Sequence, residues 1–312
     1  MLIHSHERKV VMPETQGIFW LASYPKSGNT WFRIVLSKLL KPASHLTVIN
    51  EMDSILGSPM VANRGWMNKA LGFDSAALND DDVDKLRPKT YASYAATLKR
   101  PVYIKVHDAY TFIDEHQPLF PNEGCLGAIY FIRNPLDVAI SLAHHVQCPL
   151  DWSIHMMEQP GFEVPLPGQR DKQLRQKLLS WSLHVESWTL LPDFPVLVLR
   201  YEDMLMDPVT SFSKALHFLN LHFTLEEITQ AIEDSSFEKL QDFERQFGFK
   251  EKQNGSFFRK GIAGDWLNTL TETQAHQLVK QHAAIMQQYG YLDAQGRLPA
   301  GPATTAKIVD PA

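Results

Sequence analysis

Residues 18–31 of the chain read Ile-Phe-Trp-Leu-Ala-Ser-Tyr-Pro-Lys-Ser-Gly-Asn-Thr-Trp. The apolar half of this stretch predicts a buried strand, and the polar half predicts a tight turn that reopens as a helix. The first N–H groups of a helix have no partner within it, and together with the helix dipole they favour a phosphate-like group. We therefore predict a strand that feeds an anion-binding loop.

The residue types in this loop suit an anion. Gly28 lets the backbone approach closely, and Lys26 adds a full positive charge. Further side-chain donors are Ser27, Asn29 and Thr30. The Walker A pattern Gly-x4-Gly-Lys-Ser/Thr is missing because the lysine precedes the glycine, which disfavours a magnesium–ATP site. The alternative, a purely structural crossover, gives no reason for a lysine beside Ser-Gly-Asn-Thr.

A second strand-and-turn pattern lies at residues 126–141. The apolar run 126–132 precedes Arg133, and Pro135 suits the first turn of a helix. Arg133 would then lie at the carboxyl end of a strand, with Ser141 about two turns along the helix. Two anion sites at the ends of different strands fit a nucleotide phosphorylated at two places better than a triphosphate. Taken alone, Arg133 would equally suit an ion pair with Asp137.

A third segment combines basic residues with glycines. Residues 257–266 read Phe-Phe-Arg-Lys-Gly-Ile-Ala-Gly-Asp-Trp. A loop of this kind is typical of a flap that closes over an anion. The basic pair by itself would only indicate a solvated surface, so its interest comes from the whole segment.

Together these segments resemble the sulfotransferases that use PAPS (3'-phosphoadenosine 5'-phosphosulfate). Residues 24–31 resemble the family's 5'-phosphosulfate loop, with Asn29 where threonine is more usual. Residues 133–141 resemble its 3'-phosphate element, and residues 257–266 resemble its Arg-Lys-Gly-x-x-Gly-Asp-Trp signature. The resemblance implies PAPS as co-substrate and PAP as product. The nucleotide-binding residues that it implies are Lys26, Ser27, Gly28, Asn29, Thr30, Trp31, Arg133, Ser141, Tyr201, Ser235, Phe237, Arg259, Lys260 and Gly261.

The stretch 101–108 supplies the candidate catalytic pair. Its strand pattern places Lys105 and His107 on one face, and Lys-x-His resembles the family's catalytic residues. The hypothesis is in-line displacement at sulfur, in which His107 removes the acceptor proton. Lys26 would neutralise the leaving phosphate, and Lys105 would stabilise the sulfonyl oxygens. The family suggests that Ser141 restrains Lys26. No metal is predicted, because the His and Cys residues show no ligand spacing.

Alternating strand and helix patterns predict an α/β fold in a chain of 312 residues, 44% of them hydrophobic. We expect one P-loop-like domain at 17–295, with a central parallel sheet and helices on both faces, between an N-terminal extension (1–16) and a loosely ordered tail (296–312). A helix is predicted over 171–190, before a strand that begins at Val196. Residues 46–100 and 146–170 show no clear periodicity and are expected to shape an acceptor pocket. Candidate pocket residues, with core packing as the alternative, are Trp66, Met67, Phe73, Trp152, Met156, Met157 and Phe162.

Charge and hydropathy bear on partners. The net charge of −5 argues against nucleic acid as a partner. The N-terminus lacks the apolar core of a signal peptide, and no apolar run is long enough to cross a bilayer. We therefore expect a cytoplasmic enzyme with a small or lipid-like hydroxylated acceptor and no membrane partner. At the positions of the family's dimer motif (Leu267, Thr271, Glu272 and His276) only Thr271 matches, which predicts a monomer or a non-standard dimer. The alternatives are a P-loop kinase and a non-catalytic PAP-binding protein.

Overall fold

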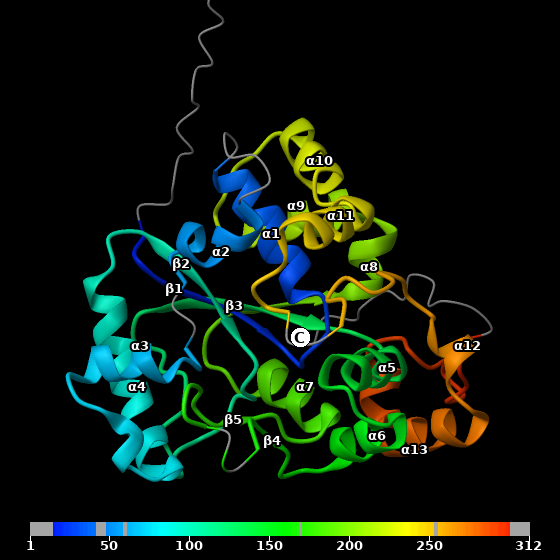
Figure 1. Cartoon of the computed structure of the whole chain (residues 1–312), viewed down its shortest axis with the longest axis horizontal. Helices are drawn as coiled ribbons and strands as arrows, with labels where there is room; N and C mark the ends of the chain where they lie inside the picture. The colour runs from blue at the N-terminus through cyan, green and yellow to red at the C-terminus, as the bar shows by residue number, and fades with distance from the viewer. Residues whose placement is uncertain are drawn as a thin grey trace, which may run out of the picture.

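The computed structural model describes residues 15–41, 48–58, 61–166, 168, 170–252 and 255–299. Most of the expected extension at 1–16 and of the expected tail at 296–312 lies outside these ranges. The described residues form the predicted α/β architecture (Figure 1).

A four-stranded parallel sheet lies at the centre, in the order β2-β1-β3-β6. Its strands are β1 (Gly17–Ser23), β2 (Pro101–Val106), β3 (Cys125–Ile132) and β6 (Val196–Arg200). Every residue of β1 is buried, which accounts for its uninterrupted apolar run, because helices cover both faces of a parallel sheet. The carboxyl ends of the four strands meet at one edge.

Helices cover both faces of this sheet, as expected (Figure 1). Phe19 and Leu21 of β1 pack in a cluster with one group of helices: α1 (Asn29–Leu40), α2 (Val48–Leu56), α8 (Tyr201–Met206), α9 (Pro208–Phe218) and α10 (Leu225–Glu233). Trp20 and Ala22 point the other way and pack with a second group: α3 (Arg64–Leu71), α4 (Asp80–Thr97), α5 (Pro135–Val146), α6 (Leu150–Glu158), α7 (Trp181–Leu190), α12 (Trp266–Thr269) and α13 (Glu272–Gln288). A third cluster joins α1 and α2 to α11 (Phe237–Phe247). The period-two alternation along β1 thus builds two core layers.

The predicted helix over 171–190 is wrong in its first half. Helix α7 begins at Trp181, where the Ser180 hydroxyl caps it by accepting a hydrogen bond from the N–H of Leu183 at 3.3 Å. Upstream, β5 (Gln176–Lys177) pairs antiparallel with β4 (Glu163–Val164). Leu174 and Leu178 are buried without belonging to a helix, so their helical spacing was misleading.

The stretches without clear periodicity contain regular structure. Residues 46–100 include α2, α3, a 3-10 turn (Ser75–Ala77) and α4, and residues 146–170 include α6 and β4. In α4 a charged residue occupies the core-facing side: Arg87 is fully buried and donates two hydrogen bonds to the Asp108 carboxylate, at 2.9 and 3.0 Å. A polar core contact of this kind hides the apolar stripe by which an amphipathic helix is found.

Candidate active site

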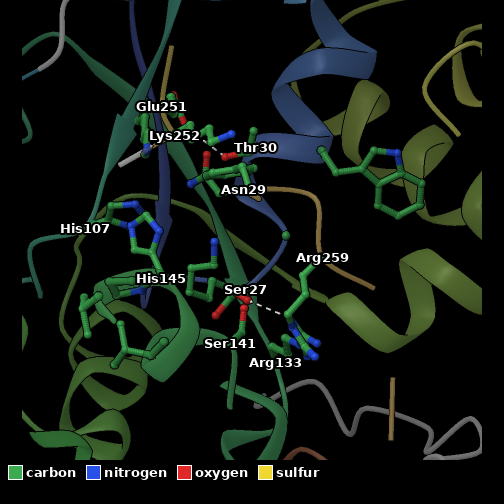
Figure 2. Close-up of a pocket in the computed structure, with 18 of the residues that line it drawn as sticks. Ser27, Asn29, Thr30, His107, Arg133, Ser141, His145, Glu251, Lys252 and Arg259 are labelled. Carbon is green, nitrogen blue, oxygen red and sulfur yellow. Dashed lines mark hydrogen bonds and ion pairs between the residues drawn. The ribbon is translucent and has the colours of Figure 1, made fainter. Parts of the chain in front are cut away.

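The carboxyl ends of the four central strands open onto one cavity of about 960 Å³. The β1–α1 loop contributes residues 25–31 to its lining, and β2 contributes Lys105. The residues that directly follow β2, β3 and β6 also line it: His107, Arg133 and Tyr201. Every predicted catalytic and nucleotide-binding residue lines this cavity. Figure 2 shows side chains from these separate segments turned toward one another.

The β1–α1 loop has a backbone that needs glycine at one position. Gly28 has φ 97° as the residue that precedes α1, and a Cβ there would lie 2.7 Å from the ring of Tyr201. Lys26 also has a positive φ, of 72°. The hydroxyl oxygen of Ser27 is buried and has no hydrogen-bond partner among the described residues. A buried polar atom without a partner is costly, and a polar group bound in the cavity would supply the missing partner.

Asn29 serves the loop in a way that the sequence did not predict. Its side-chain amide donates to the carbonyl of Leu21 at 2.8 Å, which ties the start of α1 to β1. The predicted side-chain donor is therefore already used inside the protein. The Trp31 indole N–H donates to the Ser235 carbonyl at 3.0 Å, which brings together two residues that were expected to contact the adenosine.

His107 is held in one orientation. Its Nδ1 lies 2.9 Å from the carbonyl oxygen of Ser23, so Nδ1 carries the proton and donates it there. Burial, and then the charge of Lys105, hold the pKa of His107 well below its usual range. The imidazole is consequently neutral at physiological pH, with Nε2 able to accept a proton.

A second histidine supports the first from behind. The Nε2 of His184 lies 3.1 Å from the backbone carbonyl oxygen of His107, and the Tyr130 hydroxyl lies 2.9 Å from its Nδ1. His184 is fully buried in α7. His184 was not predicted from the sequence, because a lone histidine in a helix belongs to no motif.

Two lysines and a carboxylate lie in the same region. The ammonium of Lys26 lies 4.1 Å from the centre of the Phe257 ring. Burial, with the charges of Lys105 and Arg133, lowers the pKa of Lys26 to about 8. Lys105 pairs with Glu251 at 3.1 Å, and burial lowers its pKa too. Glu251 lines the cavity but was not predicted from the sequence.

Arg133 fastens two loops to each other. It donates to the carbonyl of Lys26 at 3.0 Å and to that of Ile262 at 3.1 Å, and its guanidinium lies 4.3 Å from the centre of the Tyr201 ring. Its Nε is buried and unpartnered among the described residues. The open alternative of an ion pair with Asp137 is not realised, since Asp137 instead accepts the N–H groups that hold the third segment.

Asp137 and Asp265 are two of the carboxylates that hold the third segment. Asp137 accepts hydrogen bonds from the N–H groups of Gly264 at 2.7 Å and Trp266 at 3.0 Å. Asp265 pairs with both Arg259 and Lys260, each at 2.6 Å. The two predicted phosphate ligands thus line the cavity while sharing one carboxylate, which balances only one of their two positive charges.

Two further members of the site are placed by packing. Gly261 has φ 64°, and a Cβ there would lie 2.2 Å from the ring of Phe237, so this close approach requires glycine. Ser141, from α5, faces the region of Ser27 and Arg133 (Figure 2).

The candidate acceptor-pocket residues fall into two groups. Trp152, Met156 and Phe162 line the cavity, together with residues that were not predicted, such as Val61 and Leu178. The other candidates do not line it: Met67 and Met157 are fully buried in the core, Trp66 stacks on Tyr91 and Phe73 is 47% exposed. These four pack the inserted helices or face solvent.

In the described part of the chain, no three His, Cys, Asp or Glu side chains are grouped so as to hold a metal ion. Within the same ranges, no helix combines the length and apolar character that crossing a membrane requires.

Comparisons with known proteins agree with this geometry. A family model described as a sulfotransferase domain matches residues 17–290. Sulfotransferase 1B1 of Mus musculus is 27% identical over 284 residues, which cover 87% of this chain and 83% of that protein. Flavonol 3-sulfotransferase of Flaveria bidentis is 28% identical over 279 residues, which cover 84% and 79%.

Solved structures share the fold. Mouse sulfotransferase SULT7A1 complexed with PAP superposes with a TM-score of 0.56 at 20% identity, covering 88% of this chain and 86% of that one. Retinol dehydratase in a complex with retinol and PAP gives 0.59 at 22% identity, covering 88% and 83%. Because the family model spans nearly all of the described chain, including the three loops at the cavity, this protein belongs to the sulfotransferase family and is an enzyme of PAPS-dependent sulfonate transfer.

Proposed function

We propose that the protein transfers the sulfonate group of PAPS to a hydroxyl of a small-molecule or lipid-like acceptor, with His107 as the base. The observation that carries this proposal is the hydrogen bond from His107 Nδ1 to the Ser23 carbonyl, at 2.9 Å. It leaves a neutral Nε2 in the wall of the cavity that Lys26 and Lys105 also line. A hydroxyl group needs a base of this kind to become a nucleophile.

Two groups of polar and basic residues in the cavity are assigned to the two phosphates of the nucleotide. Lys26, Ser27 and the N–H groups at the start of α1 suit the 5'-phosphate, because the Ser27 hydroxyl is buried without a partner in the described chain. Arg133 and Ser141 suit the 3'-phosphate, with Arg259 and Lys260 available once they leave Asp265. Trp31, Tyr201 and Phe237 supply aromatic surfaces for the adenine.

The residues then divide the reaction among themselves. The acceptor oxygen forms a bond to sulfur while the bond from sulfur to the 5'-phosphate oxygen breaks, and His107 Nε2 takes the acceptor proton. Lys26 neutralises the charge that develops on the departing phosphate, and Lys105 stabilises the equatorial sulfonyl oxygens. Ser141 restrains Lys26 until an acceptor is present. No metal is assigned a role.

An apolar wall favours a largely hydrophobic acceptor. The apolar residues that line the cavity include Leu142, Met156, Phe162 and Leu178, from α5, α6 and the segments beside β4 and β5. The similar proteins include a flavonol sulfotransferase and a retinol dehydratase in a complex with retinol, and flavonols and retinol both carry hydroxyl groups; they also include an amine sulfotransferase at 24% identity. The neutral His107 is our reason for choosing a hydroxyl. A cytoplasmic location, and a monomer or non-standard dimer, stay predictions.

Calorimetric titration with PAP, 5'-AMP and magnesium–ATP tests the donor assignment. We expect PAP to bind much more tightly than 5'-AMP, because only PAP engages the Arg133 end of the cavity. A screen of hydroxyl compounds with labelled PAPS follows. Equal affinity for PAP and 5'-AMP would contradict the nucleotide assignment, and preference for magnesium–ATP would favour the kinase alternative. PAP binding without turnover would favour the non-catalytic alternative.

The affinity for PAP is expected to fall as the pH rises from about 7 to about 9. Lys26 has a pKa of about 8 in the free protein, so above that pH each complex must take up a proton to restore the charge that faces the phosphate. The affinity should therefore be highest below pH 8 and should weaken by up to about tenfold per pH unit above it. Calorimetry in two buffers of different ionisation enthalpy measures the proton uptake, and a pH-independent affinity would refute the assignment to Lys26.

A further inference from the structure

Arg33 and Glu251 extend the charged network beyond the residues that any motif marked. Arg33 lies on α1, one turn after Thr30, and its side chain is 1% exposed. Glu251 is 11% exposed. One carboxylate oxygen of Glu251 lies 2.8 Å from Arg33 Nη1, and the other lies 3.1 Å from Lys105 Nζ. The Thr30 hydroxyl donates to that second oxygen, also at 3.1 Å.

Three donors from two elements thus converge on one anionic group. Thr30 and Arg33 come from α1 and Lys105 comes from β2, and Figure 2 shows Glu251 beside Thr30. Burial opposes the ionisation of Glu251, but Lys105 and Arg33 outweigh it and hold the pKa of this carboxyl far below its usual range. The carboxylate therefore carries its full charge at any working pH.

The proposed sulfonate donor, PAPS, needs the same hydrogen-bonding groups. Lys105 is assigned above to the sulfonyl oxygens, and Thr30 is one of the predicted nucleotide-binding side chains, yet here both hydrogen-bond Glu251. The single hydroxyl proton of Thr30 cannot be given to Glu251 and to a phosphate oxygen at once, and the Lys105 ammonium attracts a second anion less strongly while its charge is paired with the carboxylate. Arg33 stays in place if Glu251 leaves, because its other terminal nitrogen pairs with Asp53. Its Nε is buried and unpartnered in the described chain.

We propose that Thr30, Arg33 and Lys105 form an anion subsite, that the Glu251 carboxylate fills it in the free protein, and that the 5'-phosphosulfate end of the donor displaces this carboxylate when it binds. Glu251 is an internal competitor for the donor, and Arg33 is an additional ligand of the subsite. The competitor keeps the three donors satisfied in the free protein. This inference rests on the proposed function, because the incoming anion is taken to be PAPS or PAP.

Glu251→Gln tests the competition. The change removes the charge and keeps the size of the side chain, so the calorimetric affinity for PAP is expected to rise by at least about tenfold, the worth of one charge-assisted hydrogen bond. Glu226→Gln is the matched control, since Glu226 is exposed on α10 and the same change in net charge there should leave the affinity unaltered. Glu251→Ala provides a second test if the glutamine variant folds poorly. An affinity for PAP that is unchanged or weaker would overturn the proposal.

Inorganic pyrophosphate separates this inference from the assignment of the donor. If Glu251→Gln binds pyrophosphate more tightly than the wild type while neither binds PAP, the subsite stands and the donor assignment fails. If PAP binds equally to both proteins, the donor assignment stands and the subsite fails. Adding Arg33→Gln to Glu251→Gln should remove most of the gain, and a gain that persists in full would exclude Arg33 from the subsite.

Discussion

His107→Ala is expected to lower kcat by about 10²- to 10⁴-fold, the usual contribution of a general base. The affinity for PAP should be nearly unchanged, because the His107 side chain bonds the Ser23 carbonyl and has no counterpart in the proposed nucleotide contacts. Single-turnover kinetics with labelled PAPS measure the first effect, and calorimetry measures the second. Because the pKa of His107 lies well below its usual range, wild-type kcat/KM should also show no acid limb near pH 6.5, the ordinary histidine value.

His145 provides the matched control for this experiment. It lines the same cavity from α5, and burial, followed by the charges of Lys26 and Lys105, lowers its pKa to about 4, so its imidazole is neutral as well. Its ring contacts Phe257 edge-on, and no hydrogen bond fixes it among the described residues. His145→Ala should therefore lower kcat much less than His107→Ala does. The reverse order would transfer the role of base to His145, and wild-type turnover by His107→Ala would refute the mechanism.

The sheet could be predicted because its strands have local signatures. The apolar runs of β1 and β3 each end in a polar turn, and Pro135 marks the first turn of α5. The failures came where long-range packing decides. The spacing of Leu174 and Leu178 fits a helix, yet the residues between them form β5. The reason is that β4 pairs with this segment, and a local sequence pattern cannot reveal such a partner.

In the candidate site, too, the local segments could be predicted and the long-range contacts could not. Its nucleotide loops are contiguous segments, so spacing could indicate them. Glu251 contacts Arg33 across 218 residues of sequence, and His184 contacts His107 across 77, so neither pair has a spacing to detect. Asn29 shows a subtler limit: its residue type suits an anion, but the nearby carbonyl of Leu21 takes its amide instead. Residue type indicates what a side chain can bind, whereas the fold decides what it meets.

Arg133→Ala is expected to weaken the binding of PAP by about 1.5 to 3 kcal/mol, or about 10- to 150-fold, the worth of a lost charge-assisted contact to a phosphate. The structure adds a second cost, because Arg133 also holds the carbonyls of Lys26 and Ile262 and thereby joins the first and third segments. Arg133→Lys should recover part of the loss, since it keeps the charge without the two-way donor geometry. Calorimetric titration with PAP measures both variants.

The comparison with 5'-AMP separates the two contributions of Arg133. If Arg133 binds the 3'-phosphate, Arg133→Ala should bind PAP more weakly and bind 5'-AMP, which lacks that group, almost as well as the wild type. If Arg133 only orders the loop at Lys26, Arg133→Ala should lose the same affinity for both ligands, because the 5'-phosphate site would be disturbed in each case. Arg245→Ala, at an exposed arginine on α11, removes the same charge and should change neither affinity. Equal losses for PAP and 5'-AMP in Arg133→Ala would therefore exclude Arg133 from the 3'-phosphate site and leave it the role of fastening the two loops.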